Sequence, residues 1–139
     1  MPIVGSILKR ALEINTKLPK SRKKLNPIKV QKKVLIKLLK KAQITSFGEA
    51  YKFDKILKSK NIIYSFKQNV PIFDYTKMYN EWWYRALSGE SYVSWPEKVK
   101  YFALSSGTSE ASSKHIPITQ DMLKAVKKTS VRQIFSLAQ

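Results

Sequence analysis

The chain has 139 residues, about the size of one domain, and 43% of them are hydrophobic, which argues against intrinsic disorder. The absence of cysteine excludes disulfides, thiolate chemistry and cysteine-ligated zinc. The formal net charge of +18 lies mainly in the N-terminal part, because residues 1–60 contain 17 Lys and Arg against 3 Asp and Glu. This charge favours attraction to polyanions.

The basic residues are almost all lysines, 23 Lys against 4 Arg, whereas bidentate recognition of guanine or phosphate favours arginine. We therefore expect no specific nucleic-acid partner and only a general attraction to anionic surfaces. No stretch approaches the roughly 20 apolar residues needed to cross a bilayer, and the start of the chain does not resemble a secretory leader. The expected location is the cytoplasm, without a transmembrane segment.

Two basic amphipathic helices are predicted in the first 44 residues. Apolar residues recur with helical spacing over residues 3–18, and a proline follows. A second helix is predicted to begin after Asn26 as N-cap, with Pro27 at its first position, and to run to about Gln43. Its apolar stripe is expected to pack against a domain, although such helices can also lie on a membrane surface. The stripe consists of Val30, Val34, Leu35, Leu38, Leu39 and Ala42.

The middle segment, residues 45–98, is predicted to mix helices with loops. Turn-forming residues at 45–48 precede a short helix over residues 53–58. A connector without helix is expected next, and it includes the extended sequence VPIF at residues 70–73.

A longer helix is predicted over residues 75–87, with Asp74 as its N-cap and Gly89 just beyond its end. Adjacent residues on a helix point about 100° apart. Only one of Trp82 and Trp83 can therefore face the core fully, and the other is expected at a flank or lining a cleft.

The last segment, residues 99–139, is predicted to form a strand, a loop, a second strand and a helix. The strands are expected within residues 99–106 and 113–119. Thr119 is the predicted N-cap of the final helix, which continues to Gln139 without a stop signal. Its candidate buried residues are Met122, Leu123, Val126, Val131, Ile134, Phe135 and Ala138.

The loop between the two strands is rich in hydroxyl groups, in the sequence YFALSSGTSEASSKHIPIT of residues 101–119. It lacks the second glycine and the Lys-Ser or Lys-Thr pair of a Walker-type loop. Backbone N–H groups and Ser/Thr hydroxyls could still bind phosphate oxygens, with Lys114 adding a positive charge. From the residues alone, a polar hairpin loop is an equally good interpretation. His115, the only histidine, has no acidic partner at a readable spacing and is interpreted as structural.

The motif FALSSGTSEASSKHIPIT closely resembles the phosphate loop of the auxin-responsive GH-three (Gretchen Hagen) family of acyl-acid amido synthetases, within the adenylate-forming superfamily. The segments TSFGEAYKF, VPIFDYTKMYNEWW and LSGESYVSWPEKVKYFALSSGTS precede it in the order that bacterial-type members show. The resemblance covers essentially the whole chain. It implies an α/β fold, here an N-terminal fragment that is mostly helical, with a strand-loop-strand near residues 99–118.

The resemblance also implies an ATP-dependent ligase that converts a small-molecule carboxylic acid into an acyl-adenylate and passes the acyl group to an amine acceptor. ATP and Mg²⁺ are the implied cofactors, and no catalytic or metal-ligating residue is assigned. Many loops of the superfamily have a glycine where this chain has Ala111 or Ser112. The implied ATP-binding residues are Ser105, Ser106, Gly107, Thr108, Ser109 and Lys114.

In that family the adenine pocket, the acyl pocket and a mobile C-terminal domain follow the loop. The chain is therefore expected to be the N-terminal part of one larger adenylating domain, in segments 1–44, 45–98 and 99–139, and to be inactive alone. Uncovered apolar faces would favour self-association. The alternative function is a basic binding module for nucleic acid or an anionic membrane surface.

Overall fold

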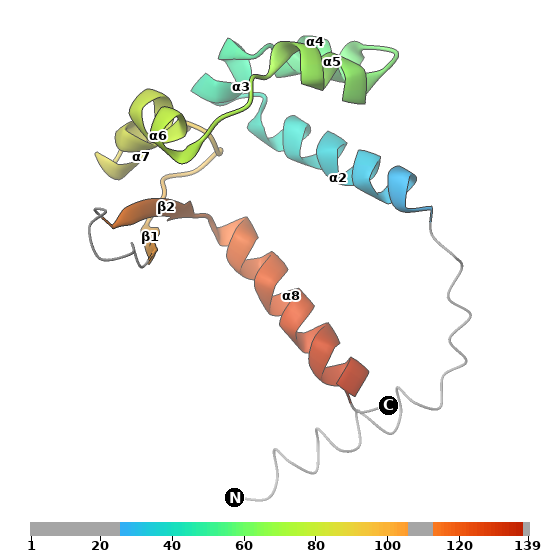
Figure 1. Cartoon of the computed structure of the whole chain (residues 1–139), viewed down its shortest axis with the longest axis vertical. Coiled ribbons are helices and arrows are strands. Elements are labelled where there is room, and N and C mark those ends of the chain that lie inside the picture. Colours follow the sequence, from blue (N-terminus) through green and yellow to red (C-terminus); the bar gives the residue numbers. More distant parts are fainter. Residues whose placement is uncertain (1–25, 106–112, 138–139) are drawn as a thin grey trace, which may run out of the picture. The chain divides into compact units, whose positions relative to one another are not determined.

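The computed structural model describes residues 26–105 and 113–137 (Figure 1). The described residues up to Thr119 form one compact unit, and residues 120–137 belong to another. The described residues are mostly helical and contain a two-stranded antiparallel sheet, which confirms the predicted α/β class. The helix predicted over residues 3–18 lies outside the described residues.

Helix α2 spans Pro27–Ala42 and begins where the sequence predicted. The side-chain oxygen of Asn26 accepts hydrogen bonds from the N–H groups of Ile28 and Lys29, at 3.0 and 3.3 Å. Pro27 stands in the first turn, where its missing N–H removes no intrahelical hydrogen bond. Local capping chemistry therefore fixes the start of this helix.

The apolar stripe of α2 is covered on one side only. Leu39 and Ala42 are buried, and Leu35 is half-buried against the same residues. The expected packing is therefore found for part of the stripe, whereas three of its members are exposed. These are Val30, Val34 and Leu38. They follow one another at four-residue spacing and point between about 100° and about 180° away from Leu39, so they lie outside the face that packs into the core.

Three short helices follow: α3 (Ser46–Ala50), α4 (Phe53–Lys58) and α5 (Ile62–Asn69). The prediction was right for α4, but α3 replaces the predicted turn and α5 replaces part of the predicted connector. Both missed helices have side-chain N-caps, Thr45 and Asn61, each accepting a hydrogen bond from the N–H three residues further on. α3 and α4 contact α2, and α5 contacts α4.

These helices enclose a core that we call the helical cluster: Leu39, Ala42, Phe53 and Ile56. Leu39 and Ile56 are each only 1% exposed. Gly48 allows α3 to approach the end of α2, because a Cβ atom there would lie 2.0 Å from the carbonyl oxygen of Ala42. The backbones themselves meet at this point.

A continuous helical stretch comes next, made of α6 (Tyr75–Met78), the π-helical turn η1 (Tyr79–Trp83) and α7 (Tyr84–Leu87). Asp74 caps it, since its Oδ1 accepts the N–H three residues on at 2.7 Å. Gly89, with a φ of +93°, follows its end. The predicted limits are confirmed, whereas the π-helical middle turn was not expected.

A second cluster consists of Ala86, Val93 and Val99, with Trp82 and Phe102 packed against it. The strands follow: β1 (Tyr101–Ser105) and β2 (Lys114–Ile118). They pair in antiparallel fashion, with Tyr101 opposite Ile118 and Ser105 opposite Lys114. The predicted strand-loop-strand is confirmed, and its loop, residues 106–112, is outside the described part of the chain. We call the paired strands β1 and β2 the hairpin.

Helix α8 spans Gln120–Leu137 and belongs to the other unit. Thr119 as its N-cap remains a prediction. The predicted burial of its apolar side chains is not confirmed where the structure describes them. Exposed are Met122, Leu123, Val126, Val131 and Ile134. None of the helices described, α8 included, is long and apolar enough to span a bilayer.

Candidate phosphate-binding site

The hairpin brings two of the six predicted ATP-binding residues together. Ser105, at the end of β1, is the register partner of Lys114, at the start of β2. Side chains directly opposite in an antiparallel pair lie on the same face, with Cβ atoms about 4.5–5.5 Å apart. The other four predicted residues fall on the loop outside the described residues. These are Ser106, Gly107, Thr108 and Ser109.

The charge of Lys114 is accessible. The residue is exposed, and no carboxylate forms an ion pair with it within residues 26–105 and 113–137. Its Nζ lies 5.2 Å from the centroid of the Tyr75 ring, within the range of a cation–π contact. Ser105 and Lys114 therefore place one hydroxyl and one ammonium group at the two ends of the loop.

Tyr75 also holds the strand that leaves the loop. The backbone N–H of His115 donates a hydrogen bond to the Tyr75 hydroxyl at 2.8 Å. The sequence reading missed this contact, because the two residues are 40 positions apart and no periodicity links them. The hydrogen bond that the structure shows for His115 comes from its backbone, and the structural interpretation of its side chain remains a prediction.

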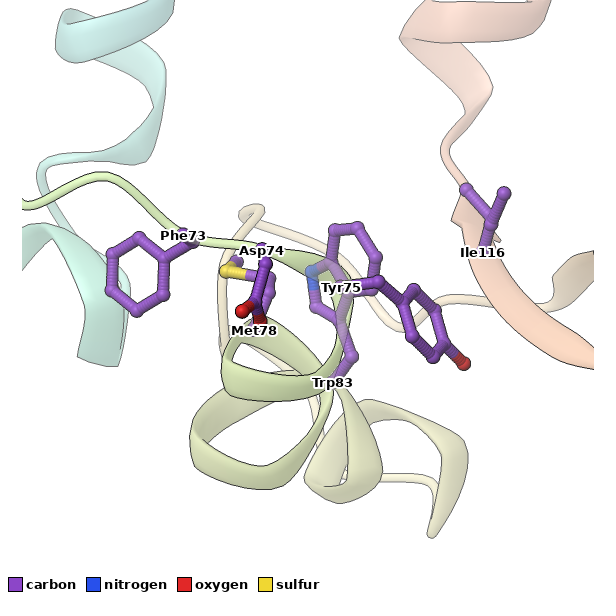
Figure 2. A pocket seen from close by; sticks show the side chains of 6 residues that line it. All are labelled: Phe73, Asp74, Tyr75, Met78, Trp83 and Ile116. Atoms are coloured by element: carbon purple, nitrogen blue, oxygen red, sulfur yellow. The ribbon is translucent and has the colours of Figure 1, made fainter.

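A cavity of about 380 Å³ lies next to Tyr75 (Figure 2). Its walls are mainly apolar, and the lining residues are Phe73, Asp74, Tyr75, Met78, Trp83 and Ile116. In Figure 2 the Tyr75 side chain extends toward the strand that carries Ile116, and Phe73 points the other way. The only charged group of the lining, the Asp74 carboxylate, already caps α6. The cavity is therefore mainly apolar, and the one carboxylate among its lining residues is already hydrogen-bonded to the backbone of α6.

The two tryptophans divide as the sequence predicted. Trp82 packs against the second cluster and its ring contacts that of Phe47 at 5.1 Å. Trp83 lines the cavity and meets the Tyr75 ring edge-on at 6.1 Å. Trp82 thus packs against the second cluster, and Trp83 packs against Tyr75, the residue that contacts the hairpin.

Residues 21–138 match the model of the family described as the GH3 family N-terminal domain. The chain belongs to the GH3 family. The comparisons with curated proteins and with solved structures found no match. The family assignment confirms the resemblance inferred from the loop motif and its upstream segments.

The described residues of this GH3 chain fit a phosphate ligand better than a directly bound metal. They contain no group of three or more His, Asp or Glu side chains that could hold a metal ion. A hydroxyl and an ammonium group, as Ser105 and Lys114 supply, are donors to phosphate oxygens. Mg²⁺ is commonly held by substrate phosphates with only one or two carboxylates and several waters, so it does not require a protein cage here.

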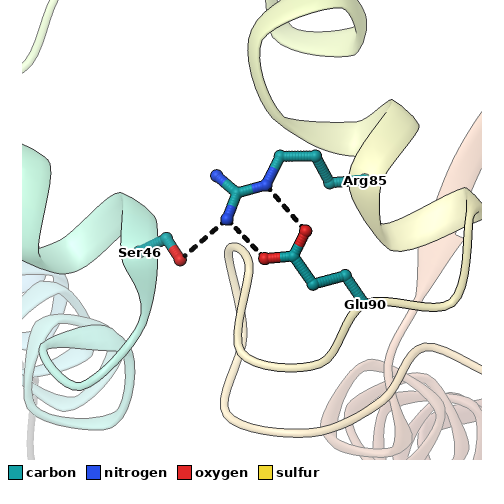
Figure 3. A network of polar contacts seen from close by, with 3 residues as sticks. All are labelled: Ser46, Arg85 and Glu90. Atoms are coloured by element: carbon teal, nitrogen blue, oxygen red, sulfur yellow. Dashed lines mark hydrogen bonds and ion pairs between the residues drawn. The ribbon is translucent and has the colours of Figure 1, made fainter.

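A polar network elsewhere in the GH3 chain joins α3 to α7 (Figure 3). The guanidinium of Arg85 donates from Nε to Glu90 Oε2 at 2.9 Å and from Nη2 to Glu90 Oε1. The same Nη2 donates to Ser46 Oγ at 3.2 Å. The hydrogen bond from Arg85 holds the pKa of the Glu90 carboxyl below its ordinary value, and raises the pKa of Arg85. This network links two helices and contains no residue of the hairpin.

Proposed function

We propose that the chain carries the ATP-phosphate loop of an ATP-dependent acyl-acid amido ligase. The observation that carries the proposal is the pairing of Ser105 with Lys114 across the base of the loop. Family membership supports it, because the loop motif lies within residues 21–138, the part of the chain that matches the GH3 family N-terminal domain. The location expected for such an enzyme is the cytoplasm, where ATP is available.

In the proposed reaction, a carboxylate oxygen of the acyl acid attacks the α-phosphorus of ATP. The bond between that phosphorus and the bridging oxygen of the β-phosphate breaks, and pyrophosphate leaves with the electron pair. Lys114 and the loop hydroxyls would bind the β- and γ-phosphates and stabilise the charge that develops on the leaving pyrophosphate. Mg²⁺ bound to the same phosphates would supply further neutralisation. The nitrogen of an amine then attacks the acyl carbon, the bond between that carbon and the phosphate oxygen breaks, AMP leaves with the electron pair, and the nitrogen releases a proton.

The proposal assigns phosphate binding to this chain and the complete reaction to a larger domain. We therefore expect no carboxylate-dependent exchange of pyrophosphate into ATP by the 139-residue chain, and detecting such exchange would refute this division of roles. MgATP binding, measured by calorimetry and by amide shifts of residues 105–115, is the positive test.

The decisive variant is Lys114→Ala, with Lys100→Ala as the matched control, since Lys100 is also exposed and lies just before β1. Losing a charged hydrogen bond to phosphate should weaken MgATP binding by about tenfold or more for Lys114→Ala, and Lys100→Ala should bind like the parent. Equal losses in both variants would show a general charge effect and contradict the proposed site. So would the absence of binding at millimolar MgATP.

A second candidate function is supported by the surface of α2. Its lysines are exposed beside the uncovered Val30, Val34 and Leu38. A basic helix with an exposed apolar flank is typical of helices that bind anionic surfaces. The exposed lysines of α2 are Lys29, Lys32, Lys33, Lys37, Lys40 and Lys41.

Neutralising four of these lysines separates the two candidates. We expect the combined change of Lys32, Lys33, Lys40 and Lys41 to Gln to weaken binding to anionic vesicles and reduce its salt dependence, while MgATP binding at the hairpin persists. Vesicle binding that survives these changes would rule out the charge of α2 as its source.

A further inference from the structure

Tyr75 is connected to the two consecutive residues that follow the loop. Its hydroxyl accepts the N–H of His115, and its ring lies under the ammonium group of Lys114. We propose that Tyr75 is a positioning residue of the phosphate-binding hairpin, which fixes both the backbone of β2 and the place of the Lys114 charge. The inference rests on the proposed function, because it assigns a role in binding the phosphates of ATP.

The hydroxyl of Tyr75 acts on the free edge of β2. In the described sheet β2 pairs with β1 on one side only. A backbone N–H that faces the other edge needs a partner, and the 2.8 Å hydrogen bond to Tyr75 Oη supplies it for His115. The same oxygen lies 3.5 Å from the His115 carbonyl oxygen, at the outer limit of a hydrogen bond. The side chain of Tyr75, on α6, therefore supplies the hydrogen bond that a third strand could otherwise supply to the backbone of His115.

The ring of Tyr75 acts on the charge. A lysine side chain has four rotatable bonds and loses rotamer freedom when its ammonium group is held at a ligand. The Nζ of Lys114 is within the range of about 6 Å over which a ring face attracts a cation. This contact favours conformations in which the ammonium group is already held over the ring, at the first residue of β2 after the loop. Part of the entropy cost of phosphate binding is then met before the ligand arrives.

Tyr75 can act in this way because its own ring is fixed. It stacks on Tyr79 at 5.8 Å with an interplanar angle of 20°, and Trp83 meets it edge-on. Asp74 caps the helical turn in which Tyr75 is the first residue. Both supporting rings belong to the π-helical turn η1, of which Tyr79 is the first residue and Trp83 the last. The residue that contacts β2, Tyr75, is thus itself packed against two aromatic rings.

The test separates the hydroxyl from the ring in the full 139-residue chain. Tyr75→Phe keeps the ring and removes the hydroxyl, and Tyr75→Leu removes both. Tyr64→Phe and Tyr64→Leu are the matched controls, because Tyr64 is 63% exposed and lies on α5. The probes are MgATP and inorganic tripolyphosphate, with binding measured by calorimetry and the His115 amide followed by NMR.

We expect Tyr75→Phe to shift the His115 amide resonance and to weaken binding of both probes by about two- to fivefold. Tyr75→Leu should weaken it further, toward the level of Lys114→Ala. Because Tyr75 acts partly through Lys114, the double variant Tyr75→Leu/Lys114→Ala should bind nearly as well as Lys114→Ala alone. A residue that only stabilised the fold would instead give additive losses.

The outcomes distinguish this inference from the proposed function. If Lys114→Ala weakens binding and both Tyr75 variants bind like the parent, the positioning role is refuted and the phosphate site stands. If Lys114→Ala has no effect, the proposed site fails, and the positioning role fails with it. Should Tyr75→Leu not fold, Tyr75→Phe decides: an unmoved His115 amide or unchanged binding refutes the role.

Discussion

The helical cluster and the hairpin differ in how they are held. Leu39 and Ile56 in the cluster are almost completely buried, and the backbones of α2 and α3 touch at Gly48. The residues of β1 and β2 are all exposed or half-buried, and Tyr75 bonds to the edge of β2. The buried contacts of this unit are therefore concentrated in the helices, whereas the candidate phosphate-binding residues Ser105 and Lys114 lie on a lightly packed strand pair. Ligand-binding segments are commonly drawn from such regions of low local stability.

The largest expected effect is that of Gly48→Ala, which would disrupt the contact between α2 and α3 beside the helical cluster. The new Cβ would lie 2.0 Å from the carbonyl oxygen of Ala42, and neither backbone can yield without separating α2 from α3. We expect a loss of at least about 3 kcal/mol in the free energy of unfolding. Urea unfolding followed by circular dichroism measures it. Glu49→Ala, at the exposed next position, is the control and should leave the unfolding midpoint nearly unchanged.

The neighbours Leu38 and Leu39 test whether burial alone separates the two faces of α2. Leu39 is 1% exposed and Leu38 is 47% exposed on the same helix. Leu39→Ala should cost about 2–5 kcal/mol because it opens a cavity in the helical cluster. Leu38→Ala should cost less than about 1 kcal/mol. Similar losses in the two variants, measured by the same unfolding experiment, would mean that the exposed flank of α2 is covered in solution, for example by self-association.

The smallest expected effect concerns Glu90, whose pKa is lowered by the hydrogen bond from Arg85. A carboxyl with a lowered pKa in the folded state stabilises the fold above the pKa of the unfolded state, about 4.3, and this stability is lost as the pH falls through the lower folded value. The parent should therefore melt slightly above Glu90→Gln at pH 7, and the difference should vanish in acid. The effect is small because the pair is solvated.

Thermal unfolding between pH 7 and pH 2.5 measures this difference, with Glu81→Gln as a control at another exposed glutamate. A gap between the parent and Glu90→Gln that widens in acid would contradict the direction of the pKa shift. If the hairpin residues lost their structure at a lower temperature than the helical cluster in the same scans, this would confirm that the hairpin is the less stable of the two.

Short-range signals in the sequence were sufficient for several elements. The caps Asn26 and Asp74 and the glycine at position 89 marked helix ends correctly, because capping depends on residues within one turn of each other. The two strands around the loop were also placed correctly. For the candidate site, the sequence named six residues, and the structure describes the two at the base of the loop, Ser105 and Lys114.

The sequence reading missed α3 and α5 because their hydrophobic patterns are too short to show a helical period, although Thr45 and Asn61 were readable as caps. It also did not give the extent to which the stripe of α2 is buried. An apolar stripe indicates which residues can be buried, but the number and placement of neighbouring helices decide how many of them are. Leu39 is covered and Leu38 is not, although both belong to the same stripe.

The sequence alone was sufficient to identify the GH3 family, the two strands around a hydroxyl-rich loop, and several helix ends. Those features depend on residues close together along the chain. Only the tertiary structure decided that Tyr75 supports the hairpin, because its contacts with Lys114 and His115 join segments some 40 positions apart. Such contacts arise from packing between elements, for which a single sequence contains no direct signal.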